Sequence, residues 1–246
     1  MLLDFSPLQI GITALLFIWA GFVRSGLGFG GAALGLPLML FVYDQPLFWL
    51  PVIGAHLLIF SSLTLTTRLD NVDWQYLKQS GVYIIPAALA GVFGLLNLPN
   101  QWLLVFIYAI SLLYATLWLL GLSVRSHRAW LDRVLLTAGG YVAGTSLTGA
   151  PLMVAVFMRN VTAGQLRNTL FVLWFVLVSI KMSTFAALDV PLQLGSALAL
   201  LPVAAIGHIV GLKAHGRILE NDRLFKRAIG GVLMLVSLLG LWKLAI

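Results

Sequence analysis

Long apolar runs separated by short polar segments make up most of this chain. A helix needs about 20 apolar residues to cross the hydrocarbon core of a bilayer. Six uninterrupted runs approach or exceed that length. They predict membrane-spanning helices over residues 47–67, 80–97, 100–121, 168–187, 193–212 and 228–245.

Two further apolar regions, 7–43 and 133–158, are interrupted by glycines. The second is too short for two full crossings, so it predicts two half-helices, at about 133–145 and 150–158, that meet at a glycine-rich apex. Irregular backbone is tolerated at membrane depth only where it packs inside protein or lines a wet cavity. For the first region, a full crossing and a re-entrant hairpin both remain open.

The composition agrees with a lipid environment. Hydrophobic residues form 61% of the 246 residues and charged residues 9%, with a mean hydropathy of +1.01, whereas a soluble domain carries about 25% charged residues. This excludes a soluble enzyme, a nucleic-acid-binding protein and a disordered chain. The absence of cysteine excludes disulfides and thiolate chemistry. No His/Asp/Glu cluster has metal-ligand spacing, so we expect no metal and no cofactor.

The net charge of +7 is concentrated between the apolar runs. Twelve of the 15 basic residues lie in four connections, over residues 68–78, 123–133, 159–167 and 213–227. The positive-inside rule places these connections in the cytoplasm and both termini outside, as expected for an integral protein of a bacterial inner membrane. The first apolar run lacks a basic leader and a clear cleavage site, so we expect it to be retained. Each broken region must then start and finish on one side of the membrane: the first outside and the second in the cytoplasm.

The two halves of the chain share two patterns. Residues 21–30 align with residues 140–149, 119 positions later, and Pro86–Gly91 aligns with Pro202–Gly207, 116 positions later. The first half begins outside and the second inside. The sequence therefore predicts an all-α membrane protein with an inverted-topology repeat, residues 1–122 and 123–246. Each repeat is a broken or re-entrant helical hairpin followed by three transmembrane helices.

The segment Gly-Phe-Val-Arg-Ser-Gly-Leu-Gly-Phe-Gly-Gly at residues 21–31 resembles the opening signature of the TauE/SafE (TSUP) family of sulfite exporter-like proteins. Residues 140–151 are similar to its second-half signature, although Thr145, Ser146 and Thr148 replace the more usual glycine or apolar residues. The resemblance covers nearly the whole chain. It implies an integral membrane transporter of small anions, often sulfur-containing.

The ionisable residues within the apolar regions are all basic. They are Arg24, His56, Lys181 and His208. All eight acidic residues fall in connections or at chain ends, so we expect the substrate to be an anion. Each basic residue also has a structural alternative. Arg24 and Lys181 could extend to a membrane surface, and a neutral histidine could bind a backbone carbonyl.

The helix breaks offer further anion ligands, because exposed N–H groups and the helix dipole attract negative charge. Thr148 is expected to cap the second half-helix, with Pro151 in its first turn. Hydroxyl groups near the breaks could donate to oxyanion oxygens. Close helix packing is the alternative role for the glycines. The predicted substrate-binding residues are Arg24, Ser25, Gly28, Gly30, Gly31, His56, Ser146, Thr148, Gly149 and Lys181.

These features predict a transporter of small anions of the sulfite, sulfonate or carboxylate type, with no catalytic residues. Its binding site would lie between the two hairpins and alternate in access as one repeat moves against the other. The membrane potential drives negative charge outward, so we expect export or facilitated passage. An intramembrane serine hydrolase using Ser146 and His208, a non-transporting assembly protein and a channel remain alternatives. The sequence leaves the anion, the coupling ion and homo-oligomerisation open.

Overall fold

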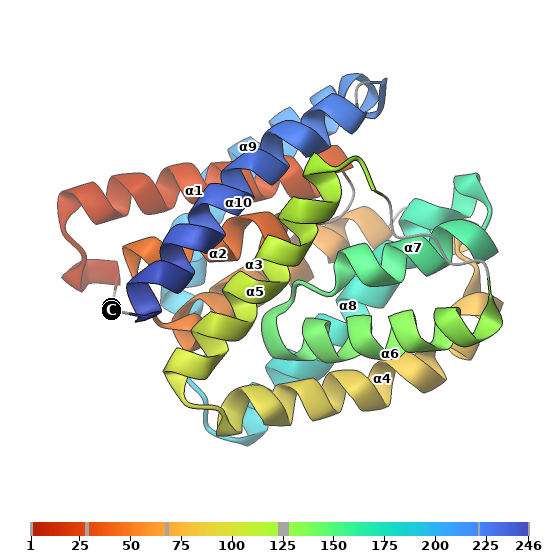
Figure 1. Ribbon diagram of the computed structural model, residues 1–246, viewed down its shortest axis with the longest axis horizontal. Coiled ribbons are helices and arrows are strands. Elements are labelled where there is room, and N and C mark those ends of the chain that lie inside the picture. Colours follow the sequence, from red (N-terminus) through yellow and green to blue (C-terminus); the bar gives the residue numbers. More distant parts are fainter. Residues whose placement is uncertain (1, 28–29, 67–68, 123–127, 221, 246) are drawn as a thin grey trace. The chain divides into compact units, whose positions relative to one another are not determined.

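The structure is a computed structural model that describes residues 2–27, 30–66, 69–122, 128–220 and 222–245. These described residues form ten α-helices, two short 3-10 helices and no strand, which confirms the all-α class (Figure 1). The helices are α1 Pro7–Leu27, α2 Gly31–Val42, α3 Pro46–Leu65, α4 Trp74–Asn97, α5 Asn100–Leu119, α6 Ala129–Ser146, α7 Ala150–Asn160, α8 Ala163–Ala187, α9 Leu194–Glu220 and α10 Asp222–Ala245. The 3-10 helices are η1 Leu2–Asp4 and η2 Leu69–Asn71.

Each of the six predicted spans falls on one long helix. Those helices are α3, α4, α5, α8, α9 and α10. Several of them continue past the predicted run, since backbone hydrogen bonding extends into polar flanks such as the start of α4. α1 is a seventh helix long and apolar enough to cross a membrane, whereas α2 is apolar but only 12 residues long. The first broken region thus pairs one long helix with one short one.

The predicted half-helices of the second broken region are confirmed as α6 and α7. α6 also includes Asp132, which the sequence pattern placed in the preceding connection.

The helices form two compact units that each combine segments from both halves of the sequence. The first unit comprises residues 1–50, 98–123 and 193–246, and the second comprises residues 51–97 and 124–192. The boundary inside α3 falls at Pro51. The broken pair α1/α2 therefore packs with α5, α9 and α10, while the broken pair α6/α7 packs with α4 and α8, in the unit that also contains most of α3.

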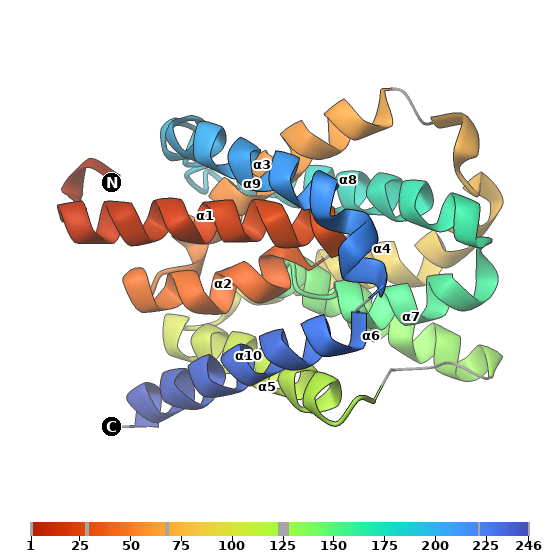
Figure 2. The same cartoon turned by 90° about the horizontal axis from the view of Figure 1, so that it is seen from above.

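In the first unit, α1 packs closely along α9 because glycines line the contact (Figure 2). A Cβ atom at Gly21 would overlap the carbonyl oxygen of Ala204, and one at Gly207 would overlap that of Ile18. Small residues let helix backbones approach closely where lipid offers no hydrophobic drive for association. The Gly207 half of the matched sequence pattern thus serves helix packing.

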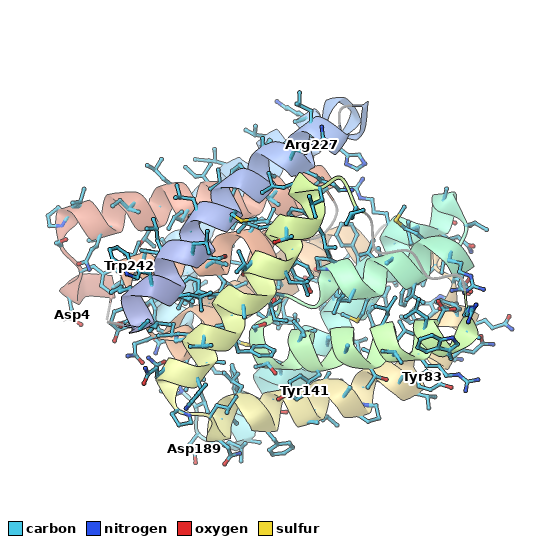
Figure 3. The ribbon with its side chains drawn as sticks, viewed as in Figure 1. Asp4, Tyr83, Tyr141, Asp189, Arg227 and Trp242 are labelled. Carbon is cyan, nitrogen blue, oxygen red and sulfur yellow. The ribbon has the colours of Figure 1, made fainter. Side chains whose placement is uncertain are left out.

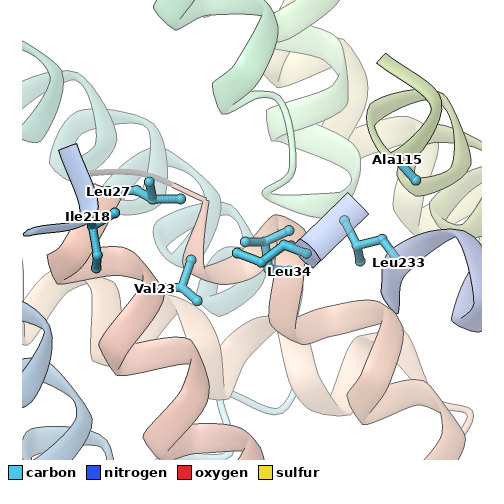
Figure 4. Close-up of a cluster of buried hydrophobic side chains, with 7 residues drawn as sticks. Val23, Leu27, Leu34, Ala115, Ile218 and Leu233 are labelled. Atoms are coloured by element: carbon cyan, nitrogen blue, oxygen red, sulfur yellow. The ribbon is translucent and has the colours of Figure 1, made fainter. Parts of the chain in front are cut away.

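An apolar cluster fills the space between α1, α2, α5, α9 and α10 of the first unit (Figure 4). Its buried members are Val23, Leu27, Leu34, Ala115, Ile218, Ile229 and Leu233. α5 and α10 are also held together where Gly240 leaves room for the ring of Tyr108.

In the second unit, α4 and α6 lie side by side through a similar glycine contact (Figure 1). A Cβ atom at Gly144 would overlap the carbonyl oxygen of Ala88, and one at Gly91 would overlap that of Tyr141. Figure 3 labels Tyr83 of α4 and Tyr141 of α6, which lie at different points along this pair, and the guanidinium of Arg133 lies 5.8 Å from the Tyr83 ring centre.

Each broken pair of helices returns the chain to the end where it began. In the first unit, the side-chain amide of Gln9 near the start of α1 donates to the carbonyl of Val42 at the end of α2, at 3.2 Å. In the second, Arg159 at the end of α7 bonds to Asp132 in the first turn of α6, at 3.0 Å. Both pairs are thus closed hairpins whose breaks lie at the far end.

The outer faces of the helices are rich in large apolar side chains. Leu8, Trp102 and Trp242 are each more than half exposed (Figure 3 labels Trp242). Such a surface is unfavourable in water and suited to lipid. It agrees with the seven candidate membrane spans.

Candidate functional site

The two helix breaks differ in the residue that turns the chain. Gly30 precedes α2 with a φ of 84°, in the left-handed region that glycine adopts readily. The break after α6 turns instead at Leu147, whose φ is 59°. A leucine in this conformation is uncommon. The positions of the glycines therefore could not show that the chain turns at Leu147. The predicted ligand Gly28 lies outside the described residues.

Arg24 and Ser25 lie in the last turn of α1, beside the first break. Both are buried, and Arg24 is only 9% exposed, so its guanidinium does not extend to a surface. Gly31 opens α2 directly against this turn: a Cβ atom there would lie 2.8 Å from both the Ala20 carbonyl oxygen and the Arg24 Cβ. The first break thus brings Arg24, Ser25, Gly30 and Gly31 together.

Two histidines of α9 hold the same turn of α1. The Nδ1 atom of His208 forms a hydrogen bond with the hydroxyl of Ser25. Seven residues along α9, Nδ1 of His215 lies 2.6 Å from the carbonyl oxygen of Gly26. A carbonyl only accepts, so the His215 ring carries its proton on Nδ1. The sequence pattern singled out His208 but gave no sign of its partner or of His215.

Lys181 of α8 lies at the second break and is 1% exposed. Its ammonium donates to the carbonyl oxygens of Gly144 at 2.5 Å and Thr145 at 3.2 Å. These carbonyls belong to the last turn of α6, where no helical N–H follows to bind them. The predicted alternative, a lysine extending to a membrane surface, is wrong: Lys181 binds the negative end of a helix instead.

The hydroxyl groups at the second break bond to one another and to the backbone. Thr145 donates to the carbonyls of Tyr141 and Gly91, at 2.9 and 3.2 Å. Ser146 donates to the carbonyl of Val142 at 3.0 Å, and its oxygen lies 2.6 Å from that of Thr148. In this state the protons of Thr145 and Ser146 go to protein acceptors.

The start of α7 differs in one detail from the prediction. The residue at its N-cap is Gly149, with no side-chain cap hydrogen bond, so the expected cap by Thr148 is wrong. The Thr148 hydroxyl faces Ser146 instead. Pro151 does lie in the first turn of α7, as predicted. A Cβ atom at Gly149 would overlap the carbonyl oxygen of Gly139, so this glycine is also required for close packing of α7 on α6.

His56 is buried in the part of α3 that belongs to the second unit. Its ring packs edge-on against Phe60, with ring centres 6.3 Å apart. Two residues earlier, Gly54 leaves room for the sulfur of Met182, which brings α3 beside α8 next to Lys181. The second unit thus carries the predicted residues His56, Ser146, Thr148, Gly149 and Lys181.

Comparison with known proteins gives the family. The model of the family described as sulfite exporter TauE/SafE matches residues 13–239. No curated protein and no solved structure matches the chain. The match includes both helix breaks and confirms the resemblance of residues 21–31. Members of this family are transporters and not enzymes, so the serine hydrolase alternative is wrong. The chain therefore belongs to the TauE/SafE family of integral membrane transporters.

Proposed function

We propose that this transporter carries small oxyanions, of the sulfite, sulfonate or carboxylate type, across the membrane. The observation that carries the proposal is that a buried basic side chain lies at each helix break: Arg24 at the first and Lys181 at the second. Ionised groups are costly within a bilayer. Two of them, each at a break in a closed hairpin, favour a negatively charged substrate.

Lys181 has bonding capacity left for such a substrate. An ammonium group carries three N–H donors, and two of them bind the carbonyls of Gly144 and Thr145. We infer that the third donates to an oxygen of the anion. At the other break, we assign the corresponding role to the Arg24 guanidinium, whose planar fork suits an oxyanion.

Backbone N–H groups at the starts of α2 and α7 would complete the two subsites. Gly30 and Gly31 lead into α2, and Gly149 leads into α7. The first N–H groups of a helix have no partner within that helix, and glycine leaves them open to a ligand. Ser146, Thr148 and His56 are proposed as further polar contacts in the second unit, with Gly28 as a further backbone contact at the first break.

We also propose that the two halves, residues 1–122 and 123–246, are inverted repeats that act by alternating access. Three observations support this proposal. Both broken hairpins are closed by one side-chain bond between their ends. Each first helix packs through glycine on a helix from the other half, α1 on α9 and α6 on α4. Pro202 and Pro86 lie inside those partner helices.

Export is the direction that the membrane potential favours. An inside-negative potential of 100 mV drives each negative charge outward by about 2.3 kcal/mol. Export of an anion therefore needs no separate energy source. The proposed orientation has the basic connections in the cytoplasm and both termini outside.

The test is flux from proteoliposomes loaded with sulfite, methanesulfonate or acetate. We expect saturable efflux of at least one anion above that from empty vesicles. Arg24→Ala and Gly149→Val should abolish it, while the exposed substitution Lys78→Ala should not. The proposal fails if no anion moves faster than through protein-free vesicles. Efflux that does not saturate would indicate a channel instead of a carrier.

A further inference from the structure

The hydrogen bond between Ser25 and His208 can run in either direction, and its direction depends on whether the imidazole is protonated. When His208 is neutral with its proton on Nε2, its Nδ1 accepts the Ser25 proton. When His208 is protonated, Nδ1–H becomes the donor and the Ser25 oxygen accepts. The two states differ by one solvent proton and by the direction of a single hydrogen bond.

Reversal of this bond changes what Ser25 can offer a substrate. With neutral His208, the hydroxyl proton is used in the bond to the imidazole. With protonated His208, the same proton is released and can be donated to another acceptor. Ser25 follows Arg24 in the last turn of α1, at the first break. An oxyanion bound by Arg24 is the acceptor that this position would serve.

We propose that His208 binds the proton that is transported with the anion, and that its protonation turns Ser25 into a hydrogen-bond donor to the substrate. The proposal rests on the anion transport inferred above and adds the coupling ion. One proton cancels the charge of a monovalent anion, so the membrane potential then no longer drives export of that pair, whereas a doubly charged oxyanion still leaves with one net negative charge. The proton enters from water onto Nδ1 of His208 and returns to water from the same atom after the anion leaves. Histidine is suited to this role because its unperturbed titration lies near neutral pH.

The charges around the pair favour joint binding of proton and anion. Charged groups on the described side chains of α1, α9 and α10 are all basic. They are Arg24, Lys213, His215, Lys226, Arg227 and Lys243, while Arg217, Glu220, Asp222 and Arg223 lie outside the described side chains. α2 and α5 carry no charged residue. A protonated His208 adds one more positive charge, which an anion at the first break would offset. By linkage, each ligand then strengthens the binding of the other.

His215 provides a matched control on the same helix. It also contacts the last turn of α1, but its acceptor is the carbonyl of Gly26, which cannot exchange roles. Protonation of His215 therefore leaves the direction of its bond unchanged. Both histidines bind the last turn of α1. Only His208 has a partner, the Ser25 hydroxyl, that can act as either donor or acceptor.

The experiment uses vesicles that contain the full-length protein, methanesulfonate inside and a trapped pH-sensitive dye. Methanesulfonate keeps its charge across the titration range of histidine. We expect about one proton to leave with each anion, and the apparent KM to rise by up to about tenfold per pH unit as the pH increases through the range in which histidine titrates. In His208→Gln, the anion efflux that remains should show neither the proton flux nor the pH dependence of KM.

Two further variants separate coupling from damage to the fold. Ser25→Ala should raise KM and reduce its pH dependence, because only the charge of His208 would still couple the proton to the anion. This variant keeps the proposal testable if His208→Gln does not fold. His215→Gln should keep the ratio of protons to anions, whatever its effect on rate. The proposal is overturned if the wild-type protein moves the anion without protons, or if His208→Gln remains coupled. Absence of any anion efflux would count against the transport function itself.

Discussion

The ammonium of Lys181 lies 2.5 Å from the carbonyl oxygen of Gly144, and both groups are buried in the second unit. A second bond to the Thr145 carbonyl makes the lysine a bridge from α8 to the end of α6. The bridge satisfies carbonyls that the helix break leaves without partners. It also holds one positive charge next to the start of the break.

Replacement of Lys181 by methionine should therefore reduce stability as well as transport. The substitution keeps the length of the side chain but leaves two buried carbonyls without their donor, at a cost of about 1–3 kcal/mol for each unsatisfied group. We expect a lower unfolding temperature for the protein in detergent or nanodiscs. Lys78→Met, at an exposed position of α4, is the control. An unchanged unfolding temperature for Lys181→Met would show that the bridge contributes nothing.

The packing of α4 on α6 predicts opposite effects for two Gly→Ala substitutions. At Gly144 a Cβ atom would overlap the backbone of Ala88, whereas at Gly164 nothing lies within 4 Å. Gly164→Ala should be neutral or stabilise by up to about 1 kcal/mol, because alanine favours helix. Gly144→Ala should destabilise, because the two helices must separate. Equal unfolding temperatures for the two variants would contradict the close contact.

The ion pair that closes the second hairpin should contribute little. Arg159 and Asp132 lie 3.0 Å apart, but their side chains are 39% and 14% exposed. Exposed pairs contribute about 0–1 kcal/mol. We expect Asp132→Asn to change the unfolding free energy by less than about 1 kcal/mol, and salt to reduce the difference further. A loss several times larger would mean that this pair, and not the contact of α7 with α6, keeps the hairpin closed.

The proposed orientation can be tested at the two ends of α4, because the chain contains no cysteine. The positive-inside rule places Lys78 near the cytoplasm and Leu98, just after α4, outside. Leu98→Cys should react with a membrane-impermeant maleimide in intact cells. Lys78→Cys should react only after the cells are opened. The reverse labelling pattern would invert the topology.

The six long spans were predictable because each is an apolar run of about the length that crosses a bilayer, and a helix satisfies all the backbone hydrogen bonds of such a run within the segment. The interruption of both apolar regions was also predictable from their glycines, but the pairing of a long α1 with a short α2 in the first region was not. The turn at Leu147 was not, because a leucine with positive φ is set by its surroundings and leaves no pattern in the sequence.

The partners of the basic residues could not be predicted either. The sequence shows that no acidic residue accompanies Lys181, but carbonyls left over at a helix end are invisible in it. The bond between Ser25 and His208 joins residues 183 positions apart. The matched pattern that ends at Gly207 indicated part of this arrangement, since Gly207 marks the face of α9 that packs on α1.

The central claim is that the buried basic groups at the helix breaks bind a small anion, and equilibrium binding tests it most directly. The purified protein is heated in the presence of sulfite, methanesulfonate, acetate or chloride. Selective stabilisation by an oxyanion is expected, rising with concentration through binding linkage and lost in Arg24→Gln. If no oxyanion stabilises the wild-type protein more than chloride does, or if Arg24→Gln responds as the wild type does, the claim is wrong.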